Sequence, residues 1–185
     1  ESLLTFLRTE QISRISIDLR FEGLRLMPLA IRLCKALISE QYKSKLLFGD
    51  AGATALAKRD CPELSDGIMS FKQISDYSSD KSHNDLLIAV SPQPYDYEYF
   101  EAACQKYHGK VIMLNGKLDD SEVGIGSVAR DRRKKFLSSW NTVYWLEPLS
   151  KGALMKSYPS DWTLFGLDPD GYRMKTEYKS KPNPE

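Results

Sequence analysis

A short apolar run in the middle of the chain constrains the fold more than any other feature. Leu86 to Val90 are consecutive apolar residues, and Ser91-Pro92-Gln93-Pro94 follows them directly. A short run without polar alternation is typical of a strand buried on both faces, as in a parallel sheet covered by helices. Proline has no backbone N–H and fixes φ, so the strand must end at this turn.

The residues after this turn extend the strand into a larger unit. Tyr95 to His108 form a helical window, and Val111 to Leu114 are a second apolar run. Strand, helix and strand within about 30 residues predict a βαβ unit with a right-handed crossover. The sequence therefore predicts an α/β fold, a Rossmann-like three-layer sandwich around a mostly parallel sheet.

The first half of the chain supplies further elements of such a fold. Ile12 to Phe21 alternates apolar and polar residues, which predicts a half-exposed strand at an edge or with one face open. Apolar spacing from Ala30 to Ile38 predicts an amphipathic helix, and Lys45 to Phe48 a short strand. Asp50 is the expected N-cap of the next helix.

The C-terminal part ends in an expected β-hairpin. Trp162 to Leu167 and Tyr172 to Tyr178 flank Asp168-Pro169-Asp170-Gly171, a sequence that favours a type I turn. We interpret Gly152 to Pro159 as a connecting segment. Residues 1–178 are expected to form a single α/β domain, and residues 179–185 a flexible tail.

Composition excludes several classes of protein. The 185 residues carry a formal net charge of +1, whereas dedicated nucleic-acid binders usually have a marked basic excess. No apolar run approaches the length of a membrane span, and no signal peptide is recognisable. The chain begins at Glu1 rather than methionine, which suggests an upstream segment. Three widely spaced cysteines and two histidines favour a reduced compartment and no metal site.

Several ordered motifs together resemble a known family. They are the strand ending in SPQP, MLNGKL, VGIGSVARDRRKKFLSSW, GALMKSYPSDWTLF and the closing DGYRM. This set resembles an uncharacterised domain family of cyanobacteria and chloroplasts. That family includes the plant low-photosystem-II-accumulation protein and the C-terminal domain of a chloroplast adenylate kinase. The resemblance implies a soluble factor in photosystem assembly, on the cytoplasmic side of thylakoids or in the chloroplast stroma. It implies no catalytic residues.

The expected carboxyl ends of the strands carry polar residues that form one candidate ligand site. Open α/β sheets bind ligands beyond these strand ends. Gly124-x-Gly126 before a helix also invites a phosphate interpretation, with Arg130 as a clamp. The alternative is that these residues serve turns, caps and a loop. The candidates are Asp50, Ser91, Gln93, Asn115, Gly124, Gly126 and Arg130.

The helix expected from about Ser127 to Trp140 carries a dense basic segment. It could dock an acidic protein or an anionic lipid surface. Alternatively it is a solvated helix face whose Val128, Phe136 and Trp140 pack inward. Tyr97, in an aromatic-rich helix, is a further candidate for exposure and partner contact, and packing over the hairpin is an equally good alternative. The basic candidates are Arg132, Arg133, Lys134 and Lys135.

Two hypotheses for function remain open. The first is a non-enzymatic domain without a cofactor that binds a photosystem subunit or assembly factor, with peripheral contact to the thylakoid membrane and no role for nucleic acid. The second is an enzyme or sensor that binds a nucleotide or phosphorylated metabolite at the strand ends. No paired acid and base lies among the expected strand-end residues, which favours the first.

Overall fold

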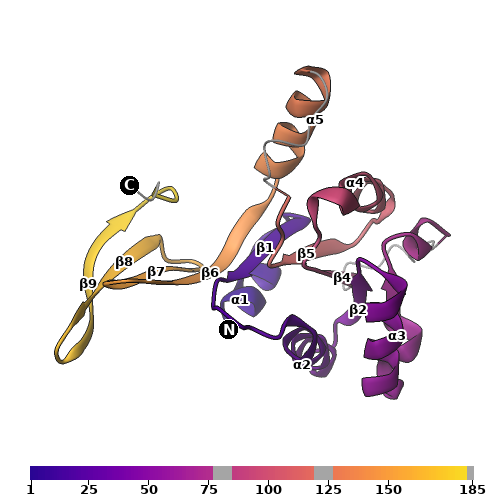
Figure 1. Cartoon of the computed structure of the whole chain (residues 1–185), viewed down its shortest axis with the longest axis horizontal. Coiled ribbons are helices and arrows are strands. Elements are labelled where there is room, and N and C mark those ends of the chain that lie inside the picture. Colours follow the sequence, from indigo (N-terminus) through magenta and orange to yellow (C-terminus); the bar gives the residue numbers. More distant parts are fainter. Residues whose placement is uncertain (77–84, 119–126, 183–185) are drawn as a thin grey trace.

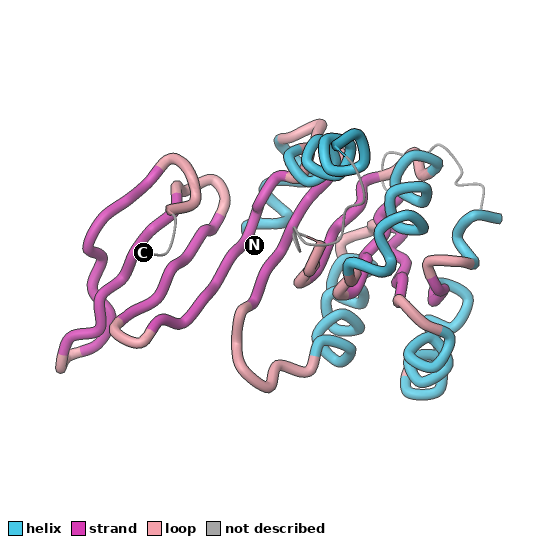
Figure 2. The backbone as a smooth tube through the Cα atoms, turned by 45° about the horizontal axis from the view of Figure 1, so that its top comes forward, coloured by secondary structure: helices cyan, strands magenta, loops and turns pink. Residues whose placement is uncertain are grey.

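The computed structural model of the chain describes residues 1–76, 85–118 and 127–182, and its described strands form one sheet. The strand order is β3-β2-β4-β5-β1-β6-β7-β8-β9 (Figures 1 and 2). Neighbours from β3 to β6 are parallel, and neighbours from β6 to β9 are antiparallel. The strands are β1 (Arg14–Leu19), β2 (Lys43–Phe48), β3 (Ile68–Ser70), β4 (Asp85–Val90), β5 (Lys110–Leu114), β6 (Asn141–Leu149), β7 (Gly152–Ser157), β8 (Trp162–Asp168) and β9 (Gly171–Tyr178).

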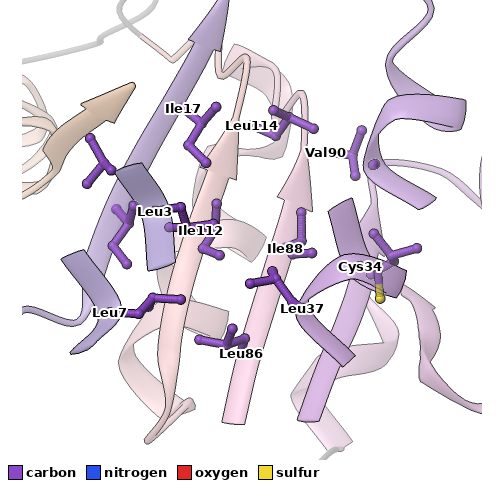
Figure 3. Packing of buried hydrophobic residues seen from close by; sticks show 14 of the residues in the cluster. Leu3, Leu7, Ile17, Cys34, Leu37, Leu86, Ile88, Val90, Ile112 and Leu114 are labelled. Atoms are coloured by element: carbon purple, nitrogen blue, oxygen red, sulfur yellow. The ribbon is translucent and has the colours of Figure 1, made fainter. Parts of the chain in front are cut away.

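Helices cover both faces of the parallel part. Residues of α1, α2 and α3 share one hydrophobic cluster with one face of the sheet (Figure 3). Residues of α4 and α5 share a second cluster with the opposite face. The α-helices are α1 (Ser2–Thr9), α2 (Leu26–Ser39), α3 (Ala51–Asp60), α4 (Tyr97–Lys106) and α5 (Ser127–Ser138). Short 3₁₀ turns span Pro62–Gly67, Gln73–Asp76 and Pro94–Asp96.

The expected buried strand is confirmed as β4. All six residues of β4 are buried, and Ile88 is 0% exposed. β4 lies between β2 and β5 in parallel pairing, with Ile88 opposite Ile112. The βαβ unit formed by β4, α4 and β5 is therefore confirmed. Helices pack on both faces of the sheet here, which explains why the apolar run of β4 is not interrupted by polar residues.

The expectation of a half-exposed strand from Ile12 to Phe21 is wrong. β1 lies inside the sheet, between β5 and β6, and its polar residues Ser16 and Asp18 are each 5% exposed. The Ser16 hydroxyl donates to Thr142 Oγ1 at 3.1 Å, and Arg20 pairs with Asp18 at 2.6 Å. These partners satisfy the polar face of β1, so the strand tolerates burial despite its alternation.

The C-terminal hairpin is confirmed, but the segment before it is not a connection. Gly152 to Ser157 form β7, which pairs with both β6 and β8. A side chain at Gly152 would collide with the carbonyl oxygen of Phe165, so glycine permits the close approach of β8. β8 and β9 flank the turn, where Gly171 has a φ of +119°. The result is a four-stranded antiparallel extension of the sheet.

Candidate partner-binding site

The basic helix α5 is anchored to the domain near its C-terminal end. Phe136 is 4% exposed and makes edge-to-face contacts with Tyr97, Phe100 and Trp140 at centroid distances of 5.6, 5.9 and 5.7 Å. The guanidinium of Arg14 lies over the Phe136 ring at 4.9 Å. Towards its N-terminus, α5 projects away from the sheet (Figure 1). The first turn of α5, where Val128 is 82% exposed, therefore packs little against the domain.

One ion pair ties this helix to α4. Arg132 lies 2.6 Å from the Glu101 carboxylate through Nη2, and its Nε donates to the other carboxylate oxygen at 3.1 Å. The Glu101 side chain is 5% exposed, whereas that of Arg132 is 64% exposed. The carboxylate raises the pKa of Arg132 through this hydrogen bond and its charge. A fork-shaped pair of this kind fixes the orientation of α5 on α4.

A second contact uses the ring of Tyr97. The guanidinium of Arg133 lies 4.4 Å from the centroid of that ring. Tyr97 is 7% exposed, and burial, followed by the nearby charge of Glu101, raises the pKa of its hydroxyl. The alternative in which Tyr97 is exposed is therefore wrong, because Arg133 and Phe136 of α5 cover its ring. On the same helix Tyr99 is 50% exposed, and Tyr95 just before it is 79% exposed.

A groove of about 530 Å³ runs between α4 and α5. Both helices contribute charged residues to its walls, and β1 contributes Arg14. Val128 also lines the groove but is 82% exposed, so its expected inward packing is wrong. Val128, Arg132 and Phe136 are four residues apart on one face of α5, and only the lower part of that face meets α4. The groove residues are Arg14, Glu101, Gln105, Val128, Asp131, Arg132, Lys135 and Phe136.

The four basic candidates divide into two kinds. Arg132 and Arg133 are engaged with α4 through Glu101 and Tyr97. Lys134 and Lys135 are exposed. Arg130, expected at a phosphate site, lies one helical turn N-terminal to Lys134 and is also exposed. The exposed cations Arg130, Lys134 and Lys135 are the groups that α5 offers to another molecule.

Asn115, at the end of β5, is bound to the backbone of β1. Its Oδ1 accepts from the Leu19 N–H at 2.8 Å, and its Nδ2 donates to the Leu19 carbonyl at 2.6 Å. Asn115 has a φ of +51°, a conformation that asparagine tolerates better than most residues. The Asn115 side chain therefore joins the end of β5 to the end of its parallel neighbour β1 by hydrogen bonds.

Ser91 and Gln93 are also engaged locally. Ser91 has a φ of +48°, and its N–H donates to the Leu114 carbonyl at 2.8 Å. Gln93 Nε2 donates to the Ser91 carbonyl and hydroxyl at 2.8 and 2.9 Å. The Gln93 N–H donates to Asp96 Oδ2 at 2.9 Å, which completes a capping box before α4.

Asp50 caps α3, as the sequence predicts. Its Oδ1 accepts from the Ala53 N–H at 2.7 Å. A side chain at Gly49 would lie 3.1 Å from Asp96 Oδ2, so the loops after β2 and β4 are close together. Burial is the main cause that raises the pKa of Asp96, and the charge of Asp50 adds to it. Gly124 and Gly126 lie outside the described residues.

Two residues of these sites, Asp96 and Glu101, are not among the candidates predicted from the sequence. The spacing of Gln93 and Asp96 matches a capping box, so Asp96 could have been found from its place before α4. Glu101 could not, because its partner Arg132 lies 31 residues away. Within the described residues, no group of three or more His, Cys, Asp or Glu side chains is placed to hold a metal ion.

The comparison with protein families adds one finding. A family profile described as "Domain of unknown function (DUF1995)" matches residues 1–185. The chain belongs to this family. No functionally curated protein matches this DUF1995 domain. No helix in its described residues is both long and apolar enough to cross a membrane.

Proposed function

We propose that this DUF1995 domain is a non-enzymatic interaction domain that docks an acidic protein surface through α5. The observation that carries this proposal is that Arg130, Lys134 and Lys135 are exposed on a helix that is anchored at Phe136 and projects from the sheet towards its N-terminus. A concentrated positive patch on a nearly neutral chain speeds the encounter with an acidic partner.

The contacts of α5 support a docking role over a purely solvated face. A helix that serves only the fold buries one continuous apolar stripe. On α5, the stripe of Val128, Arg132 and Phe136 is buried only at its lower end, and the groove beside it lies open. The pair between Arg132 and Glu101 then holds the helix in a defined direction. A preorganised helix loses less entropy on binding than a mobile one.

The alternative is an enzyme or sensor for a nucleotide or phosphorylated metabolite at the strand ends. The side chains of Asp50, Gln93 and Asn115 already bond to the backbone around them. A ligand that recruited them would have to break those bonds. Thermal melts with ATP, ADP or a sugar phosphate test this alternative, since a ligand at 100 times its dissociation constant stabilises a protein by about 2.7 kcal/mol.

The proposed setting is photosystem assembly or maintenance. It rests on the resemblance to the family of the low-photosystem-II-accumulation protein and of the domain behind a chloroplast adenylate kinase. The partner would be a photosystem subunit or assembly factor at the thylakoid surface, in the stroma or the cyanobacterial cytoplasm. The parallel half of the sheet, with helices on both faces, would be a Rossmann-like scaffold for this role.

Charge reversal on α5 tests the proposal. The double variant Arg130→Glu with Lys134→Glu changes two of the three exposed cations without touching the anchor. It should fold normally and be recovered several-fold less with thylakoid membranes or their complexes, and added salt should weaken recovery of the unmodified protein. The matched control is Arg25→Glu with Arg32→Glu, an equal charge change at exposed positions by α2. Equal recovery of both double variants and the unmodified protein would refute docking through α5.

A further inference from the structure

The antiparallel extension presents a second surface, on the opposite side of the sheet from α5. Residues of α1 meet the sheet at β6, where Tyr144 packs against the cluster that contains α1. Ser2 of α1 also hydrogen-bonds to Ser157 of β7 at 2.7 Å. Beyond α1, the strands β7, β8 and β9 extend away from the helices (Figures 1 and 2). Within the described residues, no helix lies above the α1-side face of β8 and β9.

The strand register identifies the side chains on this face. Leu146 pairs with Met155, Ala153 with Phe165, Phe165 with Met174, and Leu167 with Tyr172. Directly paired residues point to the same side of a sheet. Glu177, opposite Thr163 beyond the bulge in β9, is the one charged residue of this set. The members of this apolar face are Tyr144, Leu146, Pro148, Ala153, Met155, Ser157, Thr163, Phe165, Leu167, Tyr172, Met174 and Glu177.

The apolar face is incompletely covered. Leu167, Tyr172 and Met174 are 54%, 59% and 61% exposed, and Phe165 and Met155 are partly exposed. On the opposite face of the extension, Trp145, Leu154 and Trp162 form a small buried cluster, and Lys181 lies over the Trp145 ring at 3.6 Å. The two cations of β9, Arg173 and Lys175, pair with Asp168 on that opposite side. A contiguous exposed apolar surface of this kind marks an interaction site.

We infer that this apolar face packs against the same face of a second copy of the chain. The one carboxylate of this face, Glu177, lies on the edge strand at the end away from the hairpin turn, so two copies can meet through Phe165, Leu167 and Met174 in a self-complementary, isologous contact. A membrane surface is a poorer match, because interfacial binding combines apolar residues with cations on the same side. Pairing through the edge of β9 is disfavoured by its bulge beside Lys175 and by its charged residues.

The dimensions fit a weak dimer. Four strands about 4.8 Å apart and about six residues long, at about 3.4 Å per residue, give a flat face of roughly 400 Å². Because side chains protrude from this plane, the accessible area is larger than the flat area. Two such faces would bury on the order of 1,000 Å² in total, which is at the low end of the areas buried in specific interfaces. Two sheets packed in this way would lie about 10 Å apart. The expected dissociation constant is therefore micromolar.

Light scattering after size exclusion, from about 1 µM to about 100 µM protein, tests the inference. The unmodified protein should move from the 21.1 kDa of one protomer towards twice that mass as its concentration rises. The variant Leu167→Glu with Met174→Glu should stay monomeric with an unchanged melting curve, because both positions are exposed. The control Leu149→Glu places a single glutamate on an exposed apolar residue of the opposite face and should still dimerise.

Several results would overturn the inference. They are an unmodified protein that stays monomeric at about 100 µM, and a dimer that survives Leu167→Glu with Met174→Glu. If the unmodified protein is monomeric and floats with anionic vesicles, and Leu167→Glu with Met174→Glu abolishes that flotation, the apolar face binds a membrane instead. None of these results depends on α5, so the docking proposal stands or falls separately.

Discussion

Asn115 offers the sharpest test of whether the strand ends serve the fold or a ligand. Replacing it with alanine removes both hydrogen bonds to Leu19, the bond to its N–H at 2.8 Å and the bond to its carbonyl at 2.6 Å. Each such bond contributes about 1 kcal/mol net. Alanine at a φ of +51° adds about 1 kcal/mol of backbone strain. Asn115→Ala should therefore lower the free energy of unfolding by about 2–4 kcal/mol.

The contribution of the backbone can be separated with a second variant. Asn115→Gly loses the same two hydrogen bonds but accepts a positive φ, so it should be more stable than Asn115→Ala by about 1 kcal/mol. Urea unfolding monitored by circular dichroism measures both variants. A loss below about 0.5 kcal/mol in Asn115→Ala would show that Asn115 does not hold β1 and β5 together. If Asn115→Gly were less stable than Asn115→Ala, the positive φ at this position would not strain the alanine backbone.

Three further outcomes follow from the buried residues. Ile88→Ala should cost about 2–5 kcal/mol in urea unfolding, the range for emptying a fully buried site, and a loss below about 0.5 kcal/mol would contradict the central place of β4. Arg132→Glu should lower the melting temperature, because it places a second carboxylate beside Glu101. Lys134→Glu should leave the melting temperature unchanged, because Lys134 is exposed. Equal melting temperatures of the two variants would show that the ion pair between Arg132 and Glu101 does not stabilise the fold. The pKa of Asp96 is raised above 3.8, so the folded state holds its proton more firmly and stability falls as pH rises through this range. Asp96→Asn should therefore gain stability relative to the unmodified protein as the pH rises above about 4, and a stability difference that does not change with pH would count against a buried charge at Asp96.

The features that could be predicted from the sequence are those encoded locally. The apolar run of β4, the cap at Asp50 and the turn before Gly171 each depend on a few consecutive residues, and all three are found as expected. The place of β1 could not be predicted in this way. Its polar side chains are satisfied by Thr142, far along the chain, and by Arg20, so alternation here does not mean an exposed face.

The candidate site shows the same division. The basic character of α5 is visible in the sequence, but its attachment to α4 depends on Glu101 and Tyr97, which are about 30 residues away. No spacing rule joins such residues, because the crossover to β5 and the residues before α5 separate them. The apolar face of the extension could not be predicted from the sequence for a similar reason. It appears only once β7 is recognised as a strand, since the register of β7 aligns the residues of β6 and β8.

The two proposed surfaces lie on opposite sides of the sheet, and this arrangement predicts how they would act together. In a two-fold dimer through the apolar face, both α5 helices would point away from the interface and remain free to dock. Two linked sites bind a dense array of partners more tightly than a single site, by about 10²–10⁴ when the geometry allows both to engage. Leu167→Glu with Met174→Glu should therefore weaken retention on a surface densely coated with an acidic peptide, while its affinity for the same peptide in solution stays unchanged. Surface plasmon resonance at high and low coating densities, with Leu149→Glu as the control, measures the difference. If the monomeric variant loses no more affinity on the dense coating than on the sparse one, the two surfaces do not cooperate.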